Sequence, residues 1–287
     1  MIFVSTTFAE DDTPVSVVLE QCKKYNLNNL ELGSNHCWES DILNKVKQYD
    51  FNFLAHNYFP VPKKSLIVNI ASQDKNIWNN SVKHILNSID FCNEIGARLY
   101  TFHLGFLLDP INTNQNSKNY DFIFKESEID QSNYNDCFCS VIKALEQIIP
   151  YAKKKNVKIA IETEGSRKKE FCFFYIPDEY RKLFEHFSKN EIGINLNIGH
   201  LNLASKTFGF SPFEFVDTVA DYVYAMELSH NNGVEDQHLP IKDREWYWDI
   251  ITDNRFKSAY KILEFRSTPI ATVIQTKSLL ERKCNGI

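Results

Sequence analysis

Several short apolar runs in this sequence end in a side chain that can bind a metal ion or move a proton. The clearest cases are His56, His103 and Glu162, each of which directly follows a run of mainly apolar residues. A buried strand has no structural need for a charged residue. His, Asp and Glu are common ligands of divalent ions, and they also act as general acids and bases. The polar residues that end such runs, or follow in the next loop, are His56, His103, Glu162, Asn197, His200, Glu227, Asp236, His238 and Glu264.

The elements that must position these residues follow from hydrophobic spacing. Eight apolar runs have the length of a buried strand: Ile2–Ser5, Leu30–Leu32, Phe53–His56, Leu99–His103, Lys158–Glu162, Ile192–Leu196, Tyr222–Leu228 and Tyr260–Phe265. Segments with helical spacing follow them: Thr13–Tyr25, Asp41–Tyr49, Asn76–Ile95, Tyr134–Lys155, Pro177–Phe187, Ser211–Ala220, Arg244–Asp253 and Thr268–Arg282. Eight alternating units predict an α/β fold, a (β/α)8 TIM barrel formed as one domain over residues 1–287. An open doubly wound sheet is the alternative, but no Gly-x-Gly-x-x-Gly motif follows the first run.

In a barrel of this kind the carboxyl ends of the strands converge on one mouth, where active sites are built. Several carboxylates brought together there would repel one another, and a divalent cation would relieve the repulsion. The spacing therefore predicts a metal site at the mouth. The polar segment Asn112–Asn133 follows the fourth strand on the same side. Long polar loops of this kind are often lids or disordered segments.

The composition is that of a soluble globular protein. The chain has 287 residues, of which 43% are hydrophobic and 24% are charged. A formal net charge of −5 and a pI near 5.9 disfavour a nucleic-acid partner without ruling one out. No apolar run is long enough to span a membrane, and the N-terminus resembles a first strand more than a signal peptide. We therefore expect a cytoplasmic protein with reduced cysteines, whose oligomeric state is left open.

Short motifs in a fixed order resemble a known superfamily. They include Ala55-His56-Asn57-Tyr58, Phe102-His103-Leu104-Gly105, Ile161-Glu162-Thr163-Glu164, Leu196-Asn197-Ile198-Gly199-His200 and Leu263-Glu264. Over nearly the whole chain, the sequence is similar to the xylose-isomerase-like TIM barrels. This superfamily includes sugar phosphate isomerases and epimerases as well as the endonuclease-IV-type abasic-site nucleases, AP endonuclease family 2. The resemblance implies the same barrel and a divalent-metal site.

The resemblance also implies which residues would bind metal. In the nuclease branch nine ligands hold three zinc ions, and one group here would be His56, His103 and Glu162. A second group would be His200, Asp236 and His238. The third would be Glu162, Asn197, Glu227 and Glu264, and in the isomerase branch this third site holds the single catalytic metal.

Two residues of this third site depart from the family pattern. The family has Asp in place of Asn197 and His in place of Glu227. The two changes cancel in formal charge, so either Mn²⁺ or Mg²⁺ still binds there or the site is degraded. The cofactor predicted from the resemblance is a divalent metal, Mn, Mg, Co or Zn.

The sequence leaves three candidate functions. The leading hypothesis is an isomerase or epimerase of a small sugar or sugar phosphate, which transfers a proton through an enediolate with Glu162 and Glu264 as the catalytic residues. His56, His103, His200 and Arg266 would then bind the hydroxyls or phosphate of the substrate. The alternatives are an endonuclease-IV-type abasic-site phosphodiesterase and a non-catalytic sugar-binding barrel.

Overall fold

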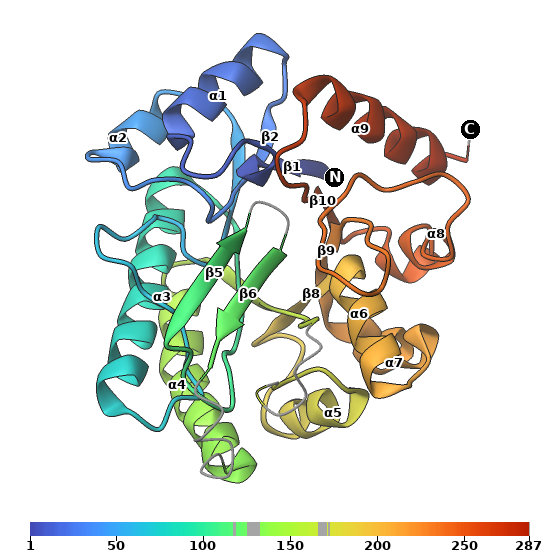
Figure 1. Cartoon of the computed structure of the whole chain (residues 1–287). Helices are drawn as coiled ribbons and strands as arrows, with labels where there is room; N and C mark the ends of the chain where they lie inside the picture. The colour runs from blue at the N-terminus through green and yellow to red at the C-terminus, as the bar shows by residue number, and fades with distance from the viewer. Residues whose placement is uncertain (117–118, 125–132, 166–170, 172, 287) are drawn as a thin grey trace.

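Eight parallel strands close into a barrel in the computed structural model of the chain (Figure 1). The structure describes residues 1–116, 119–124, 133–165, 171 and 173–286, with the side chains of 112–121 left out. The barrel strands are β1 (Ile2–Ser5), β2 (Asn29–Leu32), β3 (Asn52–His56), β4 (Leu99–Phe102), β7 (Lys158–Glu162), β8 (Gly193–Asn197), β9 (Val223–Leu228) and β10 (Tyr260–Leu263). Strands that are consecutive around the barrel pair in parallel, and β10 closes it against β1, with Leu263 opposite Val4. The predicted (β/α)8 TIM barrel is confirmed, and each predicted strand overlaps an observed one.

Helices surround the barrel (Figure 1). They are α1 (Val15–Lys24), α2 (Ile42–Lys47), α3 (Lys75–Ile95), α4 (Tyr134–Lys154), α5 (Pro177–His186), α6 (Ile198–Phe208), α7 (Pro212–Val219), α8 (Trp248–Ile251) and α9 (Ile270–Cys284). Local signals set their ends. The Asp74 carboxylate accepts hydrogen bonds from the first amides of α3, and the helix stops at Gly96, whose φ of 74° is left-handed.

Two helices differ from the prediction. The helix expected over Arg244–Asp253 is observed only over Trp248–Ile251; Arg244 itself has a φ of 61°, which a right-handed helix does not allow. Helix α6 was not predicted, and Asn197 caps it by accepting a hydrogen bond from the backbone of His200 at 3.0 Å. This helix positions His200 beside the end of β8.

An antiparallel hairpin crosses the front of the barrel mouth (Figure 1). It consists of β5 (Asn112–Asn116) and β6 (Asn119–Ile123). The segment Asn112–Asn133 was expected to be a long polar loop, and the two strands within it correct that expectation. Backbone pairing between β5 and β6 does not require the apolar alternation that sequence reading relies on. Residues 117–118 and 125–132 of the segment lie outside the described residues.

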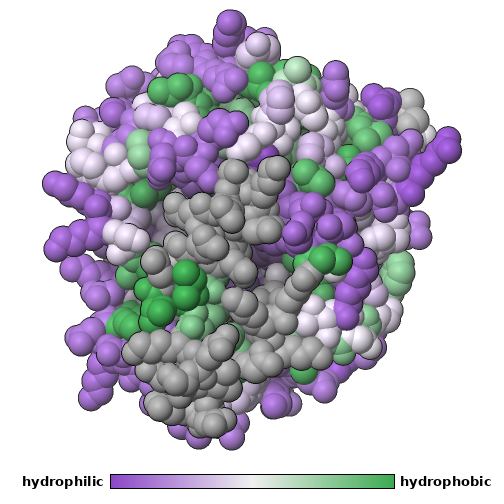
Figure 2. All heavy atoms as spheres, in the orientation of Figure 1, coloured by the Kyte–Doolittle hydropathy of each residue, from purple (hydrophilic) through white to green (hydrophobic). Residues whose placement is uncertain are grey.

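Apolar side chains are gathered inside the ring of helices. The face seen in Figure 2 is largely hydrophilic, whereas the strand residues and the inner helix faces form the core. Within the described parts of the chain, no helix is both long and apolar enough to cross a membrane. The six described cysteines form no disulfide with one another, and Cys172 lies outside the described residues.

Candidate metal centre

The barrel interior changes from apolar to polar between two successive layers of side chains. The lower layer is an apolar cluster formed by Phe3, Leu54, Leu99, Ala160, Ala225 and Ile262. Alternate residues of a strand face the same side, so the next inward positions lie two residues further along. Those positions are Ser5, His56, Thr101, Glu162, Glu227 and Glu264, all of them buried. The lower layer closes the floor of the barrel, and the upper layer presents its polar groups to the mouth.

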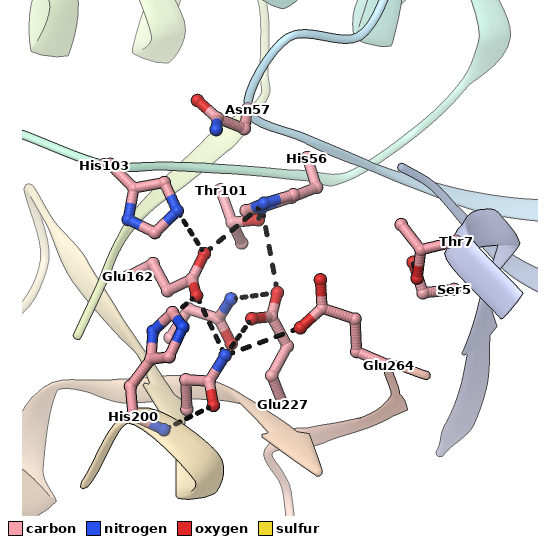
Figure 3. Close-up of polar contacts among 12 residues, drawn as sticks. Ser5, Thr7, His56, Asn57, Thr101, His103, Glu162, His200, Glu227 and Glu264 are labelled. Atoms are coloured by element: carbon pink, nitrogen blue, oxygen red, sulfur yellow. Dashed lines mark hydrogen bonds and ion pairs between the residues drawn. The ribbon is translucent and has the colours of Figure 1, made fainter. Parts of the chain in front are cut away.

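The first metal-type group is His56, His103 and Glu162. The Oε2 atom of Glu162 lies 3.4 Å from Nε2 of His56 and 3.2 Å from Nε2 of His103 (Figure 3). This oxygen is buried and makes no hydrogen bond within the described part of the chain. The Nδ1 atom of each imidazole, on the other edge of the ring, has its own partner. The Thr101 hydroxyl lies 2.9 Å from Nδ1 of His56, and the Glu164 carboxylate lies 2.7 Å from Nδ1 of His103. Outer contacts of this kind orient metal-binding histidines, so the group fits a divalent ion.

The second group is His200, Asp236 and His238. The Oδ2 atom of Asp236 lies 3.4 Å from Nε2 of His200 and 2.9 Å from Nε2 of His238. Here too each Nδ1 atom has a partner. The Thr163 carbonyl lies 2.8 Å from Nδ1 of His200, and the Glu264 carboxylate lies 3.0 Å from Nδ1 of His238. Two nitrogens and one carboxylate oxygen therefore lie close together, so this group also fits a divalent ion.

The residues of the third predicted group are also together, but their contacts differ. The Asn197 amide nitrogen donates to Glu162 at 2.9 Å and to Glu227 at 3.0 Å, and it lies 3.5 Å from Glu264. The Asn195 amide donates to the other oxygen of Glu227 at 2.6 Å. The carboxylates here are thus already engaged by hydrogen-bond donors.

Sequence reading missed Glu31, which lies on β2 next to this cluster. With His56 and Glu227 it forms a third set of ligand-type atoms that lie close together among the described residues. Glu31 is fully buried, including both of its carboxylate oxygens. The signal was present in the sequence, because a glutamate interrupts the apolar run Leu30–Leu32.

The histidines and carboxylates of the two groups shift one another's ionisation. Burial alone would raise the pKa of Glu162, but His103, His56 and His200 outweigh it and hold this pKa well below its usual range. Burial likewise opposes ionisation of Asp236, yet His238 and His200 lower its pKa. In the absence of metal, these carboxylates are therefore ionised.

Protonated histidines are the counterpart of these carboxylates. Burial would lower the pKa of His103, but Glu162 and Glu164 raise it to about 9. The pKa of His200 is also raised, because Asp236 outweighs burial. Burial and the charges of Glu162 and Glu264 raise the pKa of Glu227 well above its usual range. A metal ion entering the groups would displace histidine protons.

A cavity of about 490 Å³ opens above the polar layer. Its lining includes Glu162, Glu264, both histidine groups and Arg266. The lining also includes four aromatic rings, those of Phe106, Phe122, Phe124 and Phe171. The Phe124 and Phe171 rings are stacked with centroids 4.2 Å apart, and Phe122 packs on Phe106 at 4.5 Å. These ring contacts join the end of the hairpin to the loops after β4 and β7, so the hairpin contributes to the lining of the cavity.

All predicted site residues lie in this region. Seven of them line the cavity: His56, His103, Glu162, His200, Asp236, His238 and Glu264. Arg266, expected to bind substrate, lines it as well. Asn197 and Glu227 lie beneath, fully buried.

Gly165→Ala is expected to weaken metal binding at the second group. A Cβ at this position would lie 2.4 Å from Cα of His200, so the backbone that carries this ligand would have to move. Loss of the contacts that position a metal ligand typically lowers metal affinity by about 10- to 100-fold. Titration of the variant with Mn²⁺ measures the effect. Gly96→Ala is the control, because its strained φ of 74° also lowers stability but no atom of the site is near. Unchanged Mn²⁺ affinity in Gly165→Ala would contradict the placement of His200.

Comparison with known families agrees with this architecture. The profile of the xylose isomerase-like TIM barrel family matches residues 16–275. The chain belongs to this family. Among curated proteins, this xylose isomerase-like barrel is 25% identical over 262 residues to a probable endonuclease 4 of Mycoplasma capricolum, covering 83% of this chain and 75% of that protein. It is 30% identical over 262 residues to apurinic-apyrimidinic endonuclease 1 of Plasmodium falciparum, covering 84% of this chain but 38% of that protein.

The barrel is also similar to solved structures. A D-tagatose 3-epimerase-like protein superposes with a TM-score of 0.76 at 16% identity, covering 99% of this chain and 97% of the other. A D-psicose 3-epimerase solved in the presence of D-fructose gives a TM-score of 0.68 at 13% identity, with 98% of each chain covered. At these identities the likeness concerns the fold.

Proposed function

We propose that this xylose isomerase-like barrel is a divalent-metal-dependent isomerase or epimerase of a small sugar or sugar phosphate. The observation that carries the proposal is the cavity of about 490 Å³, whose lining combines the ionised Glu162 and Glu264 carboxylates with several phenylalanine rings. A cavity of this volume suits a small ligand. The β5–β6 hairpin lies across the front of the mouth (Figure 1), and its Phe122 lines the cavity.

Glu162 and Glu264 are the proposed proton-transfer residues. Both line the cavity, and they reach it from different strands, β7 and β10. Burial opposes ionisation of Glu264, but His238 at 3.0 Å lowers its pKa, so both glutamates are in the form that accepts a proton. One carboxylate removes a proton from the carbon beside a carbonyl and, now protonated, returns it to the neighbouring carbon in an isomerisation. In an epimerisation the other carboxylate first takes up a proton from solvent and then delivers it to the opposite face.

The two histidine groups are the proposed metal ligands. When bound, a divalent ion polarises the carbonyl and the adjacent hydroxyl of the substrate. Because Mn²⁺, Mg²⁺, Co²⁺ and Zn²⁺ all accept mixed nitrogen and oxygen ligands to different degrees, we propose a divalent metal without choosing among them. Arg266, at the edge of the cavity, is the proposed contact for a substrate hydroxyl or phosphate.

Exchange with heavy water tests the proposal. The protein is incubated with a panel of ketoses and ketose phosphates in D₂O with Mn²⁺, Co²⁺, Mg²⁺ or Zn²⁺, and followed by NMR. We expect deuterium to enter at the carbon beside the carbonyl and an isomer or epimer to accumulate, with Glu264→Gln inactive. Absence of both exchange and product across the whole panel would contradict the proposal.

Phosphodiester cleavage at abasic sites is a second candidate. The observation in its favour is that both histidine groups are intact, and the curated relatives include proteins named endonuclease 4. An abasic duplex incubated with the protein and Zn²⁺ or Mn²⁺ tests it. Incision that is lost in Glu162→Gln would favour this function over the isomerase, and intact DNA at protein excess would eliminate it.

Metal affinity at the first group is expected to rise with pH up to about 9. Divalent ions bind the neutral imidazole, whereas His103 has a pKa raised to about 9 and is protonated below that value. Each ion that binds must displace this proton, so log K should rise by up to about one for each pH unit. Calorimetric titration with Mn²⁺ in buffers of different ionisation heat counts the released protons. Affinity that does not change with pH would contradict the protonated state of His103.

A further inference from the structure

The amide group of Asn197 lies where three carboxylates meet. It is fully buried, and its nitrogen is 2.9 Å from Glu162, 3.0 Å from Glu227 and 3.5 Å from Glu264. Three carboxylates around one point form the kind of oxygen cluster that normally surrounds a cation. In this chain a neutral hydrogen-bond donor stands at that point instead.

The orientation of this amide is fixed by the backbone around it. Its Oδ1 atom accepts the His200 backbone N–H at 3.0 Å as the cap of α6, and the Asn197 backbone N–H donates to the Thr163 hydroxyl at 2.9 Å. Because the oxygen is engaged by the helix, the nitrogen must face the carboxylates. An amide nitrogen offers two protons and no lone pair for a metal ion.

Glu227 is engaged in the same way on both of its oxygens. One accepts from Asn197 at 3.0 Å and the other from Asn195 at 2.6 Å. The histidine groups differ, because Oε2 of Glu162 makes no hydrogen bond within the described residues and faces only the two imidazoles. In the first histidine group a ligand-type oxygen is thus left available, whereas both oxygens of Glu227 in the carboxylate cluster are occupied by amide donors (Figure 3).

We propose that the Asn197 amide takes the place of a divalent ion among Glu162, Glu227 and Glu264, so that the chain binds two ions, one at each histidine group. The count of two rests on the metal dependence of the proposed function. The exclusion of an ion by Asn197 rests on the hydrogen bonds alone. The carboxylate cluster, fixed by these hydrogen bonds, then holds Glu162 and Glu264 in position.

Counting bound metal in variants tests the inference. Wild type, Asn197→Asp and Asn197→Asp/Glu227→His are saturated with Zn²⁺, desalted and analysed by native mass spectrometry and elemental analysis. We expect two equivalents in wild type and one more in the double variant, whose new side chains offer an oxygen and a nitrogen in place of the amide. Asp also caps helices well, so Asn197→Asp is expected to fold. Asn202→Asp, on the same helix but away from the carboxylates, is the control and should gain none.

A double variant that gains no ion over wild type overturns the inference, whatever the wild-type count. A wild-type third ion that is lost in Glu31→Gln also overturns it, because that ion would lie at Glu31, His56 and Glu227. If the double variant does not fold, the Tm of Asn197→Asp is measured with and without Zn²⁺. A larger Zn²⁺-dependent rise in Tm than in wild type supports the inference, and an equal rise contradicts it. A wild type without metal, but with an ion gained in the variant, would leave the exclusion of an ion by Asn197 standing; it would overturn the count of two together with the metal dependence of the proposed function.

Discussion

Replacing Glu162 with Gln is expected to lower kcat by about 10³-fold, within the range that general acid–base residues contribute. The change keeps the size of the side chain but removes the charge that faces His56 at 3.4 Å and His103 at 3.2 Å. The Gln side chain also carries an N–H₂ group in place of one carboxylate oxygen. This group replaces either the oxygen that accepts a hydrogen bond from the Asn197 amide or the oxygen that faces the two imidazoles. Both the proton-transfer group and a metal ligand are lost at once.

Steady-state kinetics and metal content should be measured on the same Glu162→Gln preparation. The exposed Glu185 on α5 supplies the matched control, since Glu185→Gln removes the same charge away from the cavity. We expect this control to keep wild-type kcat and metal content. Wild-type turnover in Glu162→Gln would mean that the chemistry takes place elsewhere.

Removing divalent ions with a chelator is expected to abolish activity and to lower the Tm. Ions present at about 100 times their Kd stabilise the folded state by about 2.7 kcal/mol per site. For a domain of this size, that corresponds to a fall of roughly several degrees in Tm for each ion removed.

Thermal unfolding with and without chelator measures this second effect. Adding back Mn²⁺ or Zn²⁺ should restore both the Tm and the activity, whereas Ca²⁺, which prefers more oxygen ligands, should restore less. A chelated protein with unchanged Tm and full activity would contradict a metal at the histidine groups. A lower Tm together with no activity on any sugar, before or after chelation, would favour the non-catalytic sugar-binding alternative.

The barrel could be predicted because its signals are local and repeated. Buried parallel strands are short apolar runs, and the predicted Lys158–Glu162 matches β7 residue for residue. The polar layer could be predicted for the same reason, since a residue such as Glu162 or His56 at the end of an apolar strand stands out against it.

What the sequence did not reveal depends on contacts between distant residues. The hairpin of β5 and β6 is held by backbone pairing and docks through rings such as Phe122 on Phe106. Glu31 was overlooked because its partners lie on other strands. A single glutamate between two leucines does not by itself indicate a functional site. The identity of Asn197 was plain, but which of its two amide atoms faces the carboxylates follows only from the cap it makes with His200.

The measurement that tests the central claim most directly is anomalous X-ray scattering from crystals soaked in Mn²⁺ or Zn²⁺. The account predicts two anomalous peaks at the barrel mouth, one between His56, His103 and Glu162 and the other between His200, Asp236 and His238. The Glu162→Gln crystal should lose the first of them. Crystals that show no peak at either group under saturating metal would contradict a metal-dependent active site in this barrel.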